Sequence, residues 1–170
     1  MPSAPHRWMA LVTAEWKSAL IERDFRKRGH SFCRIYEDAV WVIQAQSSST
    51  SSALGMKMTV NLGVFLPRLN PVSGWRDEVP EWPSESACHF RTRLGSLMPE
   101  KTDLWWTADK DETATALGRQ LLPSLLHYGL AALEAVSNAA RLRAYWEGGG
   151  YGGMTKFQVE SYLAALHATN

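Results

Sequence analysis

The chain has 170 residues, of which 45% are hydrophobic and 21% charged, which is the length and composition of one globular domain. Its 18 basic and 17 acidic residues leave a formal charge of +1, so the strongly basic balance of a polyanion-binding protein is absent and a nucleic-acid partner is disfavoured. Cys33 and Cys88 are the only cysteines, which excludes a disulfide framework or a four-cysteine zinc site within one chain.

Hydropathy along the chain favours a cytoplasmic protein without membrane association. The segment 1–7 lacks the apolar core of a secretion signal. No window approaches the run of about eighteen apolar residues that a membrane helix needs.

The first predicted element is a helix over Pro5–Arg28, ended by Gly29. Basic residues crowd its last turn, where they complement the helix dipole. Apolar residues recur at helical spacing along one face: Trp8, Leu11, Val12, Trp16, Ala19 and Leu20.

A meander of strands is predicted next. Ser31–Tyr36 and Val40–Gln46 form a hairpin that turns at Glu37 and Asp38. Met56–Leu66 is the clearest strand, because apolar side chains alternate there with more polar ones. The expected buried set of this strand includes Val60 and Leu62.

A fourth strand is predicted over Ala87–Leu94 and a short fifth one over Leu104–Thr107. The alternation turns one set of fourth-strand side chains inward: Cys88, Phe90 and Leu94. The other set turns outward: His89, Arg91 and Arg93.

The connection Pro67–Ser86 is unusually long for a compact domain, and such loops are often functional. Its four prolines disfavour a helix, and its two tryptophans, Trp75 and Trp82, disfavour disorder. The loop either presents these rings to a partner or folds them back over the end of the sheet core.

The C-terminal part is predicted to be helical. One helix begins near Asp109, is kinked or restarted at Pro123 and is broken at Gly129, after which Leu130–Trp146 forms a second helix. The Gly-rich run 148–153 is expected to be a flexible hinge before a last helix. This order of elements predicts an α+β fold, with a mostly antiparallel sheet of four to five strands and helices on one face. Residues 1–147 form a single domain, to which the hinge and last helix (148–170) are appended.

Two segments resemble a known family. Met58-Thr-Val-Asn-Leu-Gly63 is one, and the other is Cys88-His-Phe-Arg-Thr-Arg-Leu-Gly95 followed by Asp103-Leu-Trp-Trp106. They are similar to an uncharacterised bacterial family known as domain of unknown function 4304. The resemblance spans about Trp8 to Leu133, and it implies a fold but no mechanism.

The outward sheet face is the main candidate site. Asn61 would lie beside three titratable side chains, His89, Arg91 and Arg93, which could receive an anion or an acidic partner. The plain alternative is a solvated sheet face, or arginines that pair internally with Asp103. We expect Asp103 to pair with Arg91 or Arg93. The adjacent Trp105 and Trp106 could stack on a base, but one of the two rings should belong to the core.

Catalytic and cofactor motifs are missing from the sequence. His89 is the only plausible general base, and no nucleophile or second carboxylate accompanies it in a recognisable relation. The other histidines lack metal-ligand spacing, and the Gly-rich run lacks the features of a phosphate loop. We therefore expect no cofactor and no bound metal, and we favour a protein that is not an enzyme.

The leading hypothesis is a non-enzymatic protein-binding domain, for example an immunity protein that neutralises a bacterial toxin. Its expected binding residues are Asn61, Trp75, Trp82, His89, Arg91, Arg93 and Asp103. The alternative is a domain that binds a small molecule or nucleotide through its anionic group. The alternative predicts a concave pocket over the sheet, whereas the leading hypothesis predicts an open and partly apolar surface. The sequence leaves the partner, the oligomeric state and the docking of the last helix open.

Overall fold

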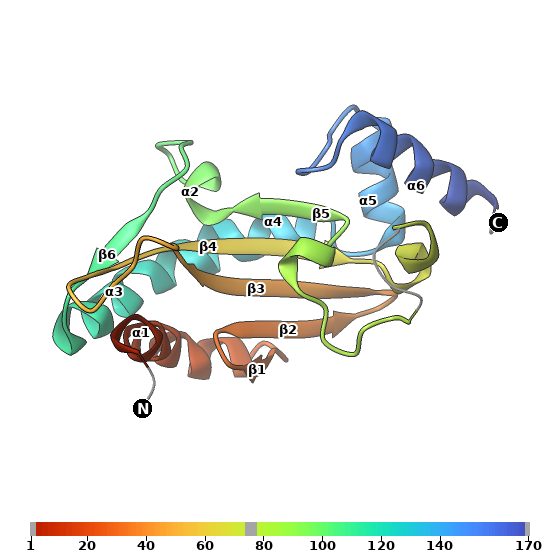
Figure 1. Ribbon diagram of the computed structural model, residues 1–170. Helices are drawn as coiled ribbons and strands as arrows, with labels where there is room; N and C mark the ends of the chain where they lie inside the picture. The colour runs from red at the N-terminus through yellow and green to blue at the C-terminus, as the bar shows by residue number, and fades with distance from the viewer. Residues whose placement is uncertain (1–2, 74–77, 169–170) are drawn as a thin grey trace.

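The structure is a computed structural model that describes residues 3–73 and 78–168. Within these residues one antiparallel sheet of six strands forms the centre of the molecule (Figure 1). Its strands are β1 (Arg26–Arg28), β2 (Ser31–Tyr36), β3 (Ala39–Ser47), β4 (Met56–Phe65), β5 (Phe90–Arg93) and β6 (Trp106–Ala108). The first five lie in chain order, and β6 pairs with the other end of the β4 edge that β5 occupies. The predicted α+β fold is confirmed.

Helices cover one face of this sheet, which we call the inner face. In Figure 1, α3 and α4 lie behind the sheet, while the segment with the short helix η2 crosses in front of it. The long helices are α1 (Ala4–Ile21), α3 (Asp111–Ser124), α5 (Ala139–Glu147) and α6 (Lys156–Ala168). The shorter ones are η1 (Pro67–Val72), η2 (Glu85–Ala87), α2 (Leu94–Leu97), the π-helical turn η3 (Leu125–Gly129) and α4 (Leu130–Ala135).

The core lies between the inner sheet face and the helices. Val60, Leu62 and Phe90 belong to it, as the alternation in β4 and β5 predicts, and Leu62 is completely buried. From α1, the Trp16 ring packs 6.4 Å from the ring of Phe32 and donates a hydrogen bond to a backbone oxygen of α3. The tryptophan thereby buries a large apolar area while its N–H keeps a partner.

The first helix is shorter than predicted. It ends at Ile21 because Asp24 adopts a left-handed φ of 65° and the backbone N–H of Phe25 bonds to the oxygen of Leu20, which closes the helix end. The basic run that we had placed in the last turn is instead the edge strand β1, paired with β2. Exposed basic side chains suit an edge strand, since they disfavour pairing with a second sheet.

The helix break predicted at Gly129 is absent from the structure. Pro123 lies inside α3, and the chain remains helical through the π turn η3 and through Gly129. A Cβ atom at Gly129 would lie 3.0 Å from a Leu125 methyl group, so this glycine serves close packing rather than a break. The helix ends at Val136, whose φ is −124°.

The long connection between β4 and β5 contains a short helix, which its prolines are predicted to disfavour. Pro67–Val72 forms the 3-10 helix η1, so the prediction that the prolines disfavour a helix is wrong for this part of the connection. Pro67 stands in its first turn, where its missing N–H would have no intrahelical partner anyway.

The last helix packs on its own chain. Its residues Val159, Tyr162 and Leu166 are buried in the core, and α6 lies against α5 and η1. The Gly-rich run joins the sheet edge, because the backbone N–H of Arg91 donates to the oxygen of Gly152 at 2.6 Å. Within 3–73 and 78–168, no helix combines the length and the apolar character needed to cross a bilayer.

Candidate functional site

The outer face of the sheet is divided into an apolar half and a polar half. At the apolar end, Cys33, Val42 and Phe65 form a small cluster with Cys88, and Trp82 and Ala87 pack on it. Further along the same strands the apolar side chains give way to amides and arginines. The η2 segment therefore covers one half of the outer face and leaves a recess beside it.

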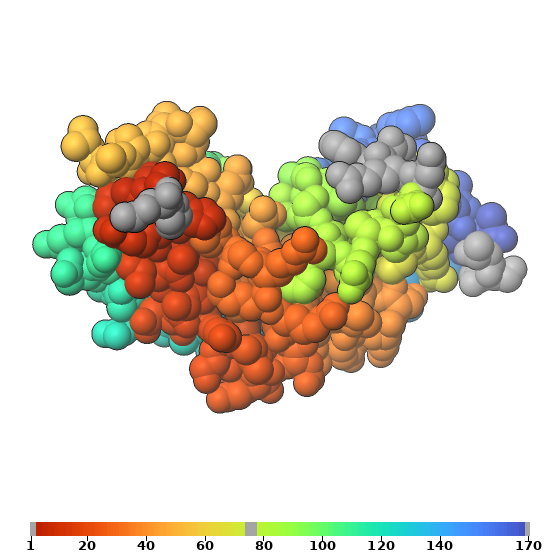
Figure 2. Space-filling model, turned by 60° about the horizontal axis from the view of Figure 1, so that its bottom comes forward, coloured from red at the N-terminus to blue at the C-terminus, as the bar shows by residue number. Residues whose placement is uncertain are grey.

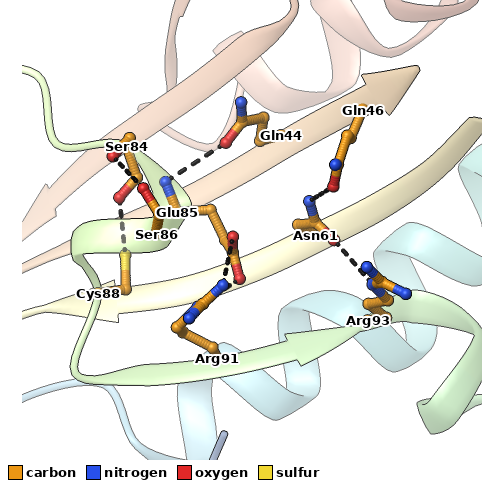
Figure 3. A network of polar contacts seen from close by, with 9 residues as sticks. All are labelled: Gln44, Gln46, Asn61, Ser84, Glu85, Ser86, Cys88, Arg91 and Arg93. Carbon is orange, nitrogen blue, oxygen red and sulfur yellow. Dashed lines mark hydrogen bonds and ion pairs between the residues drawn. The ribbon is translucent and has the colours of Figure 1, made fainter. Parts of the chain in front are cut away.

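This recess, which we call the outer cleft, has a volume of about 380 Å³. Its lining residues are Gln44, Gln46, Asn61, Ser84, Glu85, Ser86, Arg91 and Arg93. Figure 2 shows the surface hollowed between the hairpin turn that joins β3 to β4 and the η2 segment. In Figure 3 the amides rise from β3 and β4, the arginines from β5, and Ser84, Glu85 and Ser86 from the η2 segment.

Arg91 is held by Glu85 through two parallel hydrogen bonds. Its Nε atom lies 2.8 Å from Oε1 and its Nη2 atom 3.2 Å from Oε2 (Figure 3). The hydrogen bonds to Glu85 raise the pKa of Arg91, and Glu85 is only 8% exposed. Such bidentate geometry fixes both side chains, so the pair joins the η2 segment to β5 as a firm wall of the cleft.

Arg93 is held by three neighbours. Its Nε donates to Oδ1 of Asn61 at 3.3 Å and its Nη1 to Oδ2 of Asp103 at 2.6 Å. Its guanidinium carbon also lies 5.3 Å from the centre of the Trp105 ring. The hydrogen bond from Arg93 lowers the pKa of Asp103. The predicted pairing of Asp103 with one of the two arginines is thus confirmed.

The amides of the cleft floor continue this network. Asn61, 4% exposed, donates from Nδ2 to Oε1 of Gln46 at 2.6 Å. The backbone N–H of Glu85 donates to Oε1 of Gln44 at 3.3 Å. The neighbouring Thr59 is fully buried and donates to the backbone oxygen of Leu104. Side chains of this half of the sheet are therefore bonded to one another, and the alternative in which an arginine pairs internally with Asp103 is correct for Arg93.

His89 does not belong to the outer face, contrary to expectation. The ladder with β4 begins only at Phe90, and the turn η2 before it breaks the alternation that we had extrapolated. His89 is therefore 1% exposed, while Cys88, expected inward, lies in the outer cluster against Gly63. Burial lowers the pKa of His89 to about 4.

The contacts of His89 also exclude it as a base for the serine beside it. Its Nδ1 accepts the backbone N–H of Leu66 at 3.0 Å, and its Nε2 lies 2.7 Å from Oγ of Ser73. Because Nδ1 must be the acceptor, neutral His89 carries its proton on Nε2 and donates it to Ser73. No lone pair is left to take the proton of Ser73, so the contact is structural.

The two loop tryptophans have different outcomes. Trp75 lies outside the described residues. Trp82 is half-buried on the outer apolar cluster, and the guanidinium carbon of Arg26 lies 5.6 Å from its ring centre. The Trp82 ring thus folds back over the sheet and lies within reach of the Arg26 cation.

Sequence reasoning missed Gln44, Gln46 and the η2 residues Ser84, Glu85 and Ser86. A signal for the two glutamines was available, because the alternation in β3 places them on the same face as Asn61. No sequence pattern indicated that Glu85 would reach Arg91, since that contact depends on the path of the long connection.

The outer cleft has a buried cysteine beside it. Burial raises the pKa of Cys88, the thiol nearest to it, well above the ordinary value, which keeps that thiol protonated and unreactive. Among the residues that the structure describes, no three His, Cys, Asp or Glu side chains are grouped so as to hold a metal ion.

The fold and the cleft together define an α+β domain with a polar recess on the open face of an antiparallel sheet. The chain belongs to the family described as Domain of unknown function (DUF4304), whose model matches residues 16–135. No curated protein and no solved structure matches the chain. The family match includes every strand from β1 to β6 and all cleft residues.

Proposed function

We propose that the protein is a non-enzymatic, cytoplasmic domain that binds a small polar molecule in the outer cleft. The observation that carries this proposal is the concave shape and polar lining of the cleft. A volume of about 380 Å³ lies within the range of small-molecule sites, which is roughly 300–1,000 Å³. The hydrogen bonds among Arg91, Glu85, Arg93 and Asn61 hold the lining in place before a ligand arrives, which lowers the cost of ordering it.

A matched pair of serine variants tests the proposal. Ser86 lines the cleft, whereas Ser96 is exposed on α2 and does not line it. Ser86→Trp should fill the cleft, and Ser96→Trp adds the same ring elsewhere. We expect the low-molecular-weight fraction of a cell extract to raise the melting temperature of the wild type and of Ser96→Trp, but not of Ser86→Trp. Equal stabilisation of all three proteins, or of none, would contradict binding in the cleft.

A second candidate is the protein-binding domain, for instance an immunity protein with a toxin partner. Exposed apolar side chains favour it: Ile35 is 65% exposed and Val79, in the connection that precedes η2, 51% exposed. Ile35 follows Cys33 by two positions in β2 and so shares the outer face with the cleft. Co-elution with the product of a neighbouring gene, lost in Ile35→Asp and kept in Leu54→Asp, would support this candidate. Leu54 is a suitable control because its side chain is 90% exposed on the turn that joins β3 to β4, at the other end of β3 from Ile35.

A further inference from the structure

The hydrogen bonds of the outer cleft fix the orientation of all three of its amide side chains. Nε of Arg93 can only donate, so the atom of Asn61 that faces it is the oxygen Oδ1. Asn61 therefore turns Nδ2 to Gln46, and the atom of Gln46 that receives this bond is Oε1. The donor of Arg93 therefore determines, for both Asn61 and Gln46, which side-chain atom is the amide oxygen and which is the nitrogen.

Gln44 is fixed in the same way by the η2 segment. A backbone N–H can only donate, so the atom that meets the N–H of Glu85 is Oε1 of Gln44. Both glutamines thus use their oxygens within the protein. Their Nε2 groups, each with two N–H donors, have no acceptor among the described residues.

The charged side chains of the lining likewise leave donors without a partner. Both carboxylate oxygens of Glu85 accept from Arg91. Arg91 keeps Nη1 and Arg93 keeps Nη2 without a partner in the described part of the chain. Only the hydroxyls of Ser84 and Ser86, which bond to each other, can still either donate or accept.

The lining side chains also carry a net formal charge. Arg91 and Arg93 against Glu85 leave one positive charge among the lining side chains. Asp103, the ion-pair partner of Arg93, lies outside the lining with a side chain 52% exposed, and its carboxylate partly offsets the charge of Arg93. The lining side chains therefore present free donors and a formal charge of +1, which Asp103 partly offsets from outside the cleft.

We infer that the group recognised in the outer cleft is an anion with acceptor oxygens, a carboxylate or a phosphate, bound by the Nε2 groups of Gln44 and Gln46 and by the free Nη groups of Arg91 and Arg93. This inference rests on the proposed function and names the chemical class of its ligand. Charge-assisted hydrogen bonds from fixed donors are the strong kind, and fixed donors add little ordering cost. A ligand that brings only donors, or a positive charge, would meet the two hydroxyls and the second lone pairs of oxygens that already accept hydrogen bonds within the lining, and it would leave the free donors unpaired.

The decisive variants are Gln46→Glu and Gln44→Glu. Each keeps the oxygen that accepts the internal hydrogen bond and replaces the donor facing the cleft by a second acceptor with negative charge. Gln120→Glu is the matched control, because Gln120 is exposed on α3 and its substitution makes the same change in net charge outside the cleft. Retained dispersion of the amide spectrum shows that each variant is folded.

The experiment follows the side-chain amide signals of Gln44 and Gln46 by ¹⁵N NMR. Sodium phosphate and sodium citrate are the anionic probes, and together they distinguish phosphate from carboxylate binding. Agmatine is the cationic probe and N-methylacetamide is the neutral probe. We expect saturable shifts with at least one anion, and weakening of that binding by roughly tenfold or more in Gln46→Glu and Gln44→Glu. Gln120→Glu should bind as the wild type does.

Two other results have separate meanings. Shifts with agmatine or N-methylacetamide, in the absence of shifts with either anion, would overturn the inferred ligand class and leave the proposed function standing. Absence of shifts with every probe, together with no effect of Ser86→Trp on stabilisation by cell extract, would overturn both.

Discussion

Arg93 and Asp103 are joined by a 2.6 Å contact between Nη1 and Oδ2, and the same carboxylate oxygen accepts the indole N–H of Trp105 at 3.2 Å. The contact ties the segment before β6 to the end of β5. The sequence predicts this pair. The side chains are 37% and 52% exposed.

Asp103→Asn should therefore cost little stability, less than about 1 kcal/mol, because exposed ion pairs contribute weakly. Urea denaturation at pH 7 measures the change. A loss of several kcal/mol would show that the contacts of Arg93 contribute as much to stability as those of a buried ion pair.

Leu62→Ala should lower the free energy of unfolding by about 2–5 kcal/mol. The side chain is completely buried on the inner face of β4, so its removal leaves a cavity. Leu54→Ala makes the same change at a side chain that is 90% exposed and should be nearly neutral. Similar midpoints of denaturation for the two variants would contradict the register of β4.

His89 should make the protein less stable in mild acid. Its pKa falls from 6.5 in the unfolded chain to about 4 in the folded one, so folding favours the neutral imidazole. The stability that this provides is complete above pH 6.5 and declines as the pH falls from 6.5 towards 4, by up to about 3 kcal/mol in total. Protonation would place a proton on Nδ1 and break the bond from Leu66.

Urea midpoints of the wild type and of His89→Gln between pH 7 and pH 4 measure this dependence. Glutamine can accept from Leu66 and donate to Ser73 but does not titrate, so the variant should lose stability less steeply in acid. His127→Gln, at an exposed histidine of η3, should keep the slope of the wild type. Equal slopes for the wild type and His89→Gln would sink the prediction.

Trp82→Ala should destabilise the fold by about 1–3 kcal/mol, less than for a fully buried aromatic, because the ring is half-buried on the outer cluster. The loss includes the contact with Arg26. Val79→Ala, at an exposed position of the same connection, is the control. A melting temperature unchanged by Trp82→Ala would favour a ring kept for a partner over one that caps the sheet.

Gly153→Ala should weaken the docking of the Gly-rich run on β5. The residue has a φ of +76°, and a Cβ atom there would lie 2.9 Å from the backbone oxygen of Arg91. Gly149→Ala provides the matched comparison, because its φ is +90° but no atom lies within 4 Å of the added Cβ. Strain alone should cost about 1–3 kcal/mol in each. Thermal denaturation should show a larger loss for Gly153→Ala, and an equal loss would mean that the close approach to Arg91 relaxes freely.

The sequence by itself determined the central strands and their faces. Strict alternation over Met56–Phe65 decided which side chains of β4 enter the core, because a one-residue slip would bury Lys57 and expose Leu62. It also determined that Asn61, Arg91 and Arg93 share the outer face. These features are local, since a strand carries its periodicity in its own residues.

Only the tertiary structure decided the composition of the cleft. Glu85 comes within reach of Arg91 because the long connection passes over the outer face and turns through η2 just before β5. The same turn removes His89 from the outer face, which periodicity alone placed there. The path of a long connection depends on apolar contacts far apart in sequence, such as those of Cys88 and Trp82 with Cys33 and Phe65, and such contacts leave no periodic signal.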